Sequence, residues 1–154
     1  YDNILKQLSP TEVEAVLAHE LGHQKKHHIV KGMAKSILMS FVMFALLKFL
    51  LSYDLFYSLH GITTHNMAIG LVLVSLIGHF YTGMFTPLGT WQSRKFEFEA
   101  DGFAKQFSSG ENLARALKKM YKFNFSSLTP HPLYSSFYYS HPPPIERVIK
   151  LLEE

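Results

Sequence analysis

The chain has 154 residues, a formal net charge of +3 and no cysteine. So small a charge gives no reason to expect a nucleic-acid partner. The lack of cysteine excludes disulfides and thiolate metal ligands, so His, Asp or Glu must hold any metal ion. The mean hydropathy of +0.05 conceals a segregated sequence. Apolar residues concentrate in two blocks, while charged residues gather at both ends and between residues 91 and 122.

The first expected helix begins after Ser9 and runs to about His28. Ser9 is a suitable N-cap, Pro10 suits the first helical position, and Glu12 completes a capping box. An apolar stripe supports this helix and fades toward its basic end; it consists of Val13, Val16, Leu17 and Leu21.

Two apolar blocks follow, at residues 36–53 and 67–88. As a helix the first block would be about 27 Å long, close to the thickness of a bilayer. Each block is apolar on all faces, and so short a chain lacks enough protein to cover both. We therefore expect a transmembrane hairpin in contact with a lipid bilayer. The alternative is a pair of helices buried in a large soluble core.

The charges around this hairpin predict its orientation. The loop at residues 54–66 contains no Lys or Arg. Both flanks are basic, with Lys25, Lys26, Lys31 and Lys35 before the hairpin and Arg94 and Lys95 after it. By the positive-inside rule the flanks face the cytoplasm and the loop faces the other side. We expect a multi-pass integral membrane protein, in the endoplasmic reticulum membrane of a eukaryote or the inner membrane of a bacterium.

The rest of the chain predicts further helices at residues 93–108, 111–122 and 145–152, and an irregular but ordered loop at residues 124–144. The predicted fold is therefore mainly α-helical, with a two-helix transmembrane hairpin inserted into a helical core of the zincin type. We interpret residues 1–154 as a single domain. Because the chain begins at Tyr1, we also interpret it as a piece of a longer polypeptide, whose remainder is then a partner. A trimmed but otherwise complete protein is the alternative.

The sequence His19-Glu20-Leu21-Gly22-His23 is an H-E-x-x-H motif in the middle of the first expected helix. A spacing of four places both imidazoles on one face, where each can give a nitrogen to the same Zn²⁺. Glu20 projects beside the ion and can accept a proton from a water molecule that the ion activates. The motif predicts one zinc ion per chain and metal-assisted hydrolysis of a peptide bond. The predicted orientation of the hairpin places this zinc site on the cytoplasmic side.

A catalytic zinc site needs a third protein ligand. His27 lies about 12 Å beyond His19 along a helix, too far to share the ion. One soluble class of zinc proteases has its third His where this chain has Ile29. The other possibility is a glutamate on a later helix, and Glu97 is the leading candidate. The hairpin returns the chain to the side of the membrane where His19 and His23 lie, and Glu97 follows it. Asp101, on the same face, suits an acceptor that fixes the tautomer of a zinc-bound His. A solvated helix edge is the other interpretation of this acidic pair.

Three motifs, in this order, resemble the type I CaaX prenyl endopeptidases, which are integral-membrane zinc proteases. They are His-Glu-Leu-Gly-His at residues 19–23, Ser-Arg-Lys-Phe-Glu-Phe-Glu-Ala-Asp at residues 93–101, and Ser-His-Pro-Pro-Pro-Ile-Glu-Arg at residues 140–147. The resemblance covers about residues 8–152. Members of that family are longer, with membrane helices and a substrate-pairing edge strand before the zinc helix, which favours the interpretation of this chain as a fragment.

The resemblance implies a set of roles. The implied zinc ligands are His19, His23 and Glu97, and the implied general base is Glu20. The resemblance also implies that His141 and Arg147 face the substrate, where they stabilise the oxyanion or grip the peptide backbone.

The predicted function is therefore a membrane-embedded zinc metalloendopeptidase similar to the CaaX prenyl proteases. Its substrates would be peptides or proteins, prenylated C-terminal peptides among them. One alternative is a membrane quality-control protease of the HtpX kind with the same chemistry. Another is a zinc-binding fragment that is inactive without its N-terminal portion. We interpret His28 as an interfacial or loop residue, and we do not expect Glu99 among the ligands because it lies on the opposite side of its helix from Glu97.

Overall fold

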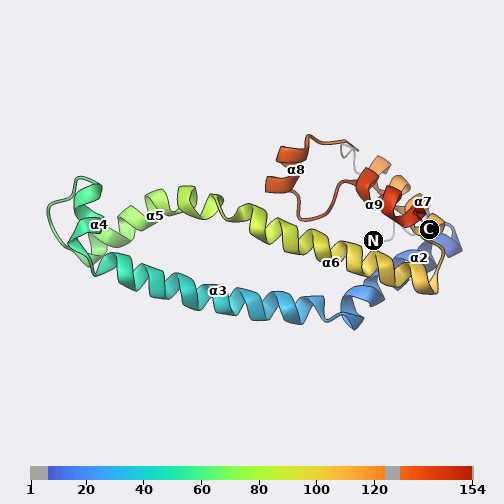
Figure 1. The fold of residues 1–154 in the computed structure, drawn as a ribbon, viewed down its shortest axis with the longest axis horizontal. Helices are drawn as coiled ribbons and strands as arrows, with labels where there is room; N and C mark the ends of the chain where they lie inside the picture. The colour runs from blue at the N-terminus through green and yellow to red at the C-terminus, as the bar shows by residue number, and fades with distance from the viewer. Residues whose placement is uncertain (1–6, 124–128, 154) are drawn as a thin grey trace. The chain divides into compact units, whose positions relative to one another are not determined.

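The computed structural model describes residues 7–123 and 129–153, which are mostly helical and contain no strand. The prediction of a mainly α-helical fold is confirmed. In chain order the helices are α2 (Pro10–Lys25), α3 (His28–Leu51), α4 (Asp54–Leu59), α5 (Met67–Gly83), α6 (Thr86–Phe107), α7 (Gly110–Phe123), α8 (Pro132–Tyr138) and α9 (Pro144–Leu152) (Figure 1). They form two compact units. The core unit comprises the chain up to Ile29 and again from Thr86, and the inserted unit comprises Val30–Phe85.

Helix α2 begins where the sequence predicts, because its first turn is fully capped. The Ser9 hydroxyl accepts a hydrogen bond from the Glu12 backbone N–H, and the Ser9 N–H donates to the Glu12 carboxylate at 2.7 Å. Pro10 occupies the first turn, where its missing N–H costs nothing. The Glu12 carboxylate is buried and also accepts from Lys119 of α7 at 2.6 Å. The Lys119 hydrogen bond is the main cause of a lowered pKa at Glu12.

The end of α2 differs from the prediction. The helix ends at Lys25 rather than near His28, and α3 begins at His28. Between the two helices His27 has a φ of 54°, a left-handed conformation that is uncommon for a residue with a Cβ. The chain therefore turns sharply at the point where an uninterrupted helix was expected.

Small residues allow α2 and α6 to pack closely. A Cβ added at Gly22 would lie 3.1 Å from both the Cα and the carbonyl oxygen of Ala100. The alanines on the facing surfaces are buried; they are Ala15 and Ala18 on α2, and Ala100 and Ala104 on α6. Because no large side chain separates the two backbones, longer side chains from the next turns can meet between the helices.

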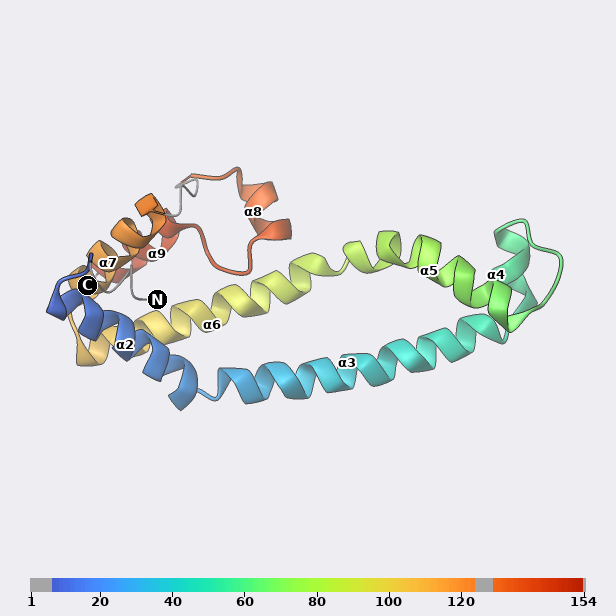
Figure 2. The same ribbon diagram turned by 180° about the vertical axis from the view of Figure 1, so that it is seen from behind.

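Helices α7 and α9 complete the core unit. Helix α7 packs against α2, α6 and α9, and the four helices lie together in both views (Figures 1 and 2). The shared apolar core consists of Ala15, Ala18, Ala104, Leu113, Ala114, Leu117, Val148 and Leu151. The expected helices at residues 111–122 and 145–152 correspond closely to α7 and α9. The helix expected at residues 93–108 is the second part of α6, which begins earlier, at Thr86.

The segment expected as an irregular loop contains a short helix. Residues 124–128 of that segment lie outside the described residues. The remainder includes α8, which the sequence analysis did not predict, with Pro132 in its first turn and the His131 side chain as its N-cap. The Thr90 hydroxyl of α6 donates to the carbonyl oxygen of Ser136 at 2.6 Å and holds α8 against α6.

In the inserted unit, α3 and α5 run in opposite directions, with α4 in the connection between them (Figure 1). Tyr57 of α4 is buried and its hydroxyl donates to the carbonyl oxygen of Leu51, at the end of α3. The Asn66 side chain accepts from the Ala68 N–H at 2.8 Å and caps α5. Polar contacts thus define the connection, while the helices themselves are apolar.

Among the described residues, one helix, α3, is long and apolar enough to cross a membrane, and almost none of its most apolar stretch is buried. It contains most of the first predicted span, residues 36–53, but begins earlier and ends at Leu51. The apolar stretch of α5 is shorter, Met67–Phe80. The second predicted span, residues 67–88, runs past the end of α5 at Gly83. The two-span topology therefore stays a prediction.

Candidate metal centre

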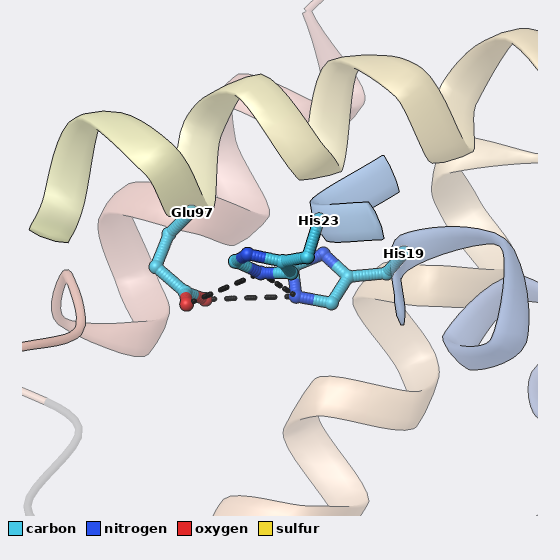
Figure 3. A group of neighbouring side chains, drawn as sticks. All are labelled: His19, His23 and Glu97. Carbon is cyan, nitrogen blue, oxygen red and sulfur yellow. Dashed lines mark hydrogen bonds and ion pairs between the residues drawn. The ribbon is translucent and has the colours of Figure 1, made fainter. Parts of the chain in front are cut away.

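His19 and His23 project from α2 toward Glu97 on α6 (Figure 3). Their Nε2 atoms lie 3.2 Å apart. The Nε2 of His19 is 3.6 Å from Oε2 of Glu97, and the Nε2 of His23 is 3.5 Å from Oε1. One ligand atom from each residue lies within 4.8 Å of the other two. The structure therefore brings together the three residues that the sequence predicts as ligands.

The spacing of these atoms fits a tetrahedral metal ion. Bonds of about 2.0 to 2.2 Å in tetrahedral geometry hold ligand atoms about 3.3 to 3.6 Å apart. The distances from the two Nε2 atoms to the nearer oxygens of Glu97, 3.6 and 3.5 Å, lie within that range, and the 3.2 Å between the Nε2 atoms is just below it. Two imidazole nitrogens and one carboxylate leave a fourth position open, which is the pattern of a catalytic site rather than a closed structural one.

His19 is held by a buried ion pair. Its Nδ1 lies 2.9 Å from Oδ1 of Asp101. Arg147 of α9 donates to the same carboxylate twice, from Nε to Oδ2 at 2.8 Å and from Nη2 to Oδ1 at 2.6 Å. Because the carboxylate accepts from Nδ1–H, the lone pair of His19 is on Nε2, which faces Glu97. Asp101 thus has the geometry that the sequence predicts for it.

Hydrogen bonds keep Asp101 ionised although it is buried. Burial is the largest single influence on its pKa and raises it, but the hydrogen bonds from His19 and Arg147 outweigh burial, and the net pKa is lowered. Burial likewise lowers the pKa of Arg147, yet the hydrogen bond and the charge of Asp101 outweigh it and leave that pKa raised. Both groups are therefore charged and pair with each other inside the protein.

Arg147 also supports the third predicted ligand. Its Nη1 lies 3.0 Å from Oε2 of Glu97. Only 4% of the residue is exposed, so two carboxylates surround a guanidinium that the sequence analysis expected to face the substrate. The structure gives Arg147 a holding role toward Asp101 and Glu97, and its contact with substrate stays a prediction.

His23 is supported differently, by two residues that the sequence analysis did not connect to the site. Its Nδ1 lies 3.0 Å from Nδ1 of His28, whose Nε2 lies 3.1 Å from Oε2 of Glu99. The ring of His28 stacks on Phe96, with ring centroids 4.2 Å apart. The interpretation of His28 as an interfacial or loop residue is wrong, because the residue is buried against the site. A continuous helix would place it about 140° around the axis from His23, and the turn at His27 removes that separation.

His141 reaches the same cluster from the segment before α9. Its Nδ1 lies 3.0 Å from Oε1 of Glu97, and its side chain is 60% exposed. The hydrogen bond to Glu97 is the main cause of a raised pKa at His141. For Glu97 burial is the largest influence and raises the pKa, but the hydrogen bond from His141 and the charge of Arg147 outweigh it, and the net pKa is lowered. His141 is thus the exposed partner of Glu97, and Arg147 is its buried partner.

A cavity of about 520 Å³ opens beside the cluster. Its polar lining comprises His19, Glu20, His23, Glu97, Tyr121, His141 and Arg147. Its apolar lining comprises Val16, Ile29, Leu113, Leu117 and Met120. Glu20 is exposed on this wall. A cavity lined by both polar and apolar side chains suits a ligand of mixed character, such as a peptide.

The chain is similar to proteins of known family. A family model described as peptidase family M48 matches residues 1–154. CAAX prenyl protease 1 of Saccharomyces cerevisiae is 32% identical over 98% of this chain and 37% of its own length. The CAAX prenyl protease 1 homolog of Homo sapiens is 38% identical over 89% of this chain and 29% of its own.

A solved structure also matches. The crystal structure of S. mikatae Ste24p superposes with a TM-score of 0.76 at 34% sequence identity, over 93% of this chain and 36% of that one. The chain thus spans little more than a third of the length of the relatives that it matches first.

Proposed function

Because the chain belongs to peptidase family M48, we propose that it forms the zinc-binding catalytic part of a membrane metalloendopeptidase. The observation that carries this proposal is the convergence of His19, His23 and Glu97 beside a cavity that Glu20 lines. The donor atoms are imidazole nitrogens and a carboxylate, which suit zinc, and three protein ligands leave a position for water or substrate. When bound, zinc acidifies a water molecule and polarises the scissile carbonyl.

The residues of this chain would divide the remaining work. Glu20, beside two ligands on the wall of the cavity, would accept a proton from the attacking water and deliver it to the leaving amine. His141, exposed and with a raised pKa, would donate a hydrogen bond to the oxygen on which charge develops. Arg147 would keep Glu97 and Asp101 ionised and in place.

The names of the relatives and the lining of the cavity support a proposal for the substrate class. Relatives named CAAX prenyl protease support peptides with a prenylated C-terminus as substrates. The apolar part of the lining, including Leu113, Leu117 and Met120, supports a substrate with an apolar side chain or group next to the scissile bond.

The replacement Glu20→Gln tests the proposed chemistry. In a longer protein that cleaves peptides, we expect Glu20→Gln to retain stoichiometric zinc and to lose at least about 10²-fold in turnover, because the base is removed and the ligands are not. Glu14→Gln is the matched control, since Glu14 is exposed on the same helix and does not line the cavity. Near-normal turnover in Glu20→Gln would remove Glu20 as the base.

We also propose that the inserted unit crosses the membrane twice, with the metal site on the cytoplasmic side. The apolar length of α3 and the lack of Lys and Arg at residues 54–66 support this topology. Because the chain has no cysteine, single cysteines can be introduced at two exposed positions, Thr64 and Lys118. An impermeant thiol reagent should label them from opposite sides of a sealed vesicle, and labelling from one side would contradict the two-span topology.

A further inference from the structure

His23 reaches a supporting carboxylate through an intervening histidine, whereas His19 contacts its carboxylate directly. From His23 the contacts run through the ring of His28 to the carboxylate of Glu99. His28 is 4% exposed and its ring is fixed by stacking on Phe96. Glu99 lies on the same helix as Glu97, yet it is not part of the metal cluster. An ion pair with Lys95 at 3.9 Å further anchors its carboxylate.

The hydrogen-bonding capacity of these groups determines where the protons lie. A carboxylate can only accept, so the Nε2 of His28 carries a hydrogen and donates to Glu99. In a neutral imidazole the other nitrogen is then an acceptor. The Nδ1 of His28 therefore accepts from Nδ1–H of His23 across 3.0 Å. This arrangement leaves the lone pair of His23 on Nε2, the atom that lies 3.5 Å from Glu97.

The turn between α2 and α3 makes these contacts possible. His27 adopts a left-handed φ of 54°, and α3 starts at the next residue. Sparsely populated backbone conformations in residues with a Cβ persist where the surroundings hold them, and they cluster at functional sites. Here the turn brings His28 back against the ring of His23, only five positions earlier in the chain.

We propose that His28 and Glu99 are positioning residues for the metal: they fix the tautomer and the ring orientation of His23 so that its Nε2 faces the ion. The proposal rests on the proposed metal site, and it adds a relay in which a carboxylate acts on a ligand through an intervening histidine. For the other histidine ligand, His19, Asp101 fixes the tautomer and the ring orientation by direct contact.

The test measures metal binding and not peptide cleavage. The positioning role can therefore fail while the proposed peptidase activity stands, and the peptidase activity can fail while the positioning role stands. Zinc affinity of the full chain in detergent is measured by competition with a chromophoric chelator, and the visible spectrum is recorded after loading with Co²⁺. We expect His28→Ala to weaken zinc binding about 10- to 100-fold, the usual cost of losing such support, and to alter the cobalt spectrum. His28→Asn keeps an acceptor and should recover part of the affinity.

Three further variants protect the test against a folding defect. Glu99 is one-third exposed, so Glu99→Ala should fold and still bind zinc more weakly, while Glu99→Gln keeps an acceptor and should bind nearly as the wild type does. His27→Asn is the matched control, because His27 is exposed and Asn tolerates its backbone conformation. Zinc affinity within about twofold of wild type, with an unchanged cobalt spectrum, in both His28→Ala and Glu99→Ala would overturn the proposal.

Discussion

The two candidate ligands on α2 are a single helical turn apart, yet the protein supports them by different means. His19 is supported from inside the core unit, by an ion pair between Asp101 and Arg147 whose members are almost fully buried. His23 has a side chain that is 23% exposed, against 10% for His19. Its support comes through His28, whose partner Glu99 is partly exposed.

This difference has consequences for how each half of the site can fail. A buried charge that loses its partner is costly, so the His19 half combines metal binding with the stability of the fold. The His23 half carries less buried charge, and a change there should affect the metal more than the fold. Helix α2 thus presents His19 as part of the core, and it presents His23 with a ring orientation that depends on residues near the surface.

Replacement of Glu97, which lies between the two halves, should have the largest effect. Its carboxylate faces both histidines, so Glu97→Ala removes a ligand and should abolish stoichiometric zinc at any practical concentration. Glu99 lies two positions away on α6, and the metal site of the Glu99→Ala variant should still be fully occupied at saturating zinc. Metal content by mass spectrometry on the purified variants distinguishes the two, and the reverse result would exchange the roles of the two glutamates.

Replacement of Arg147 should damage the His19 half and the shared ligand Glu97. Arg147→Met removes the buried guanidinium from Asp101 and from Glu97, which keeps its contact with His141, and this loss should lower stability by about 3 to 5 kcal/mol. Lys150→Met on the same helix is the control. Lys150 is exposed and lies over the ring of Phe98, so its loss should cost no more than about 1 kcal/mol. Thermal unfolding in detergent compares them, and equal losses would mean that the ion pair is not a structural support.

The sequence predicts one half of the site better than the other, and the reason is geometric. The ligands and Asp101 occupy regular helical spacings, so a periodic helix model brings His19, His23, Glu97 and Asp101 to the correct faces. His28 could not be found in this way, because its contact with His23 depends on the left-handed residue His27. No glycine stands at that position, and a sequence of basic residues there predicts a continuing helix.

The fold shows the same division between regular and irregular features. Capping signals predict the start of α2, and the helices predicted at residues 111–122 and 145–152 correspond to α7 and α9. Helix α8 was not predicted, because it is short, and a tertiary hydrogen bond from Thr90 supplements the local capping by His131. Burial of Arg147 also needs the tertiary structure, because an arginine in an amphipathic helix normally faces solvent.

The smallest predicted effect concerns Gly22, which stands between the two histidines and determines how closely α2 approaches α6. An added Cβ would lie 3.1 Å from the backbone of Ala100, which is too close without a small shift of the helices. Overpacking of this kind costs about 1 to 3 kcal/mol, and replacing glycine within a helix returns about 1 kcal/mol. Gly22→Ala should therefore lower stability by about 1 kcal/mol, measured by thermal unfolding, and weaken zinc binding because both histidines move relative to Glu97.

Gly102→Ala is the matched control: a Cβ there meets nothing within 4 Å, so this variant should be neutral or stabilised by up to about 1 kcal/mol. If Gly22→Ala were as stable as Gly102→Ala and bound zinc as tightly, close packing of the two helices would not determine the spacing of the ligands.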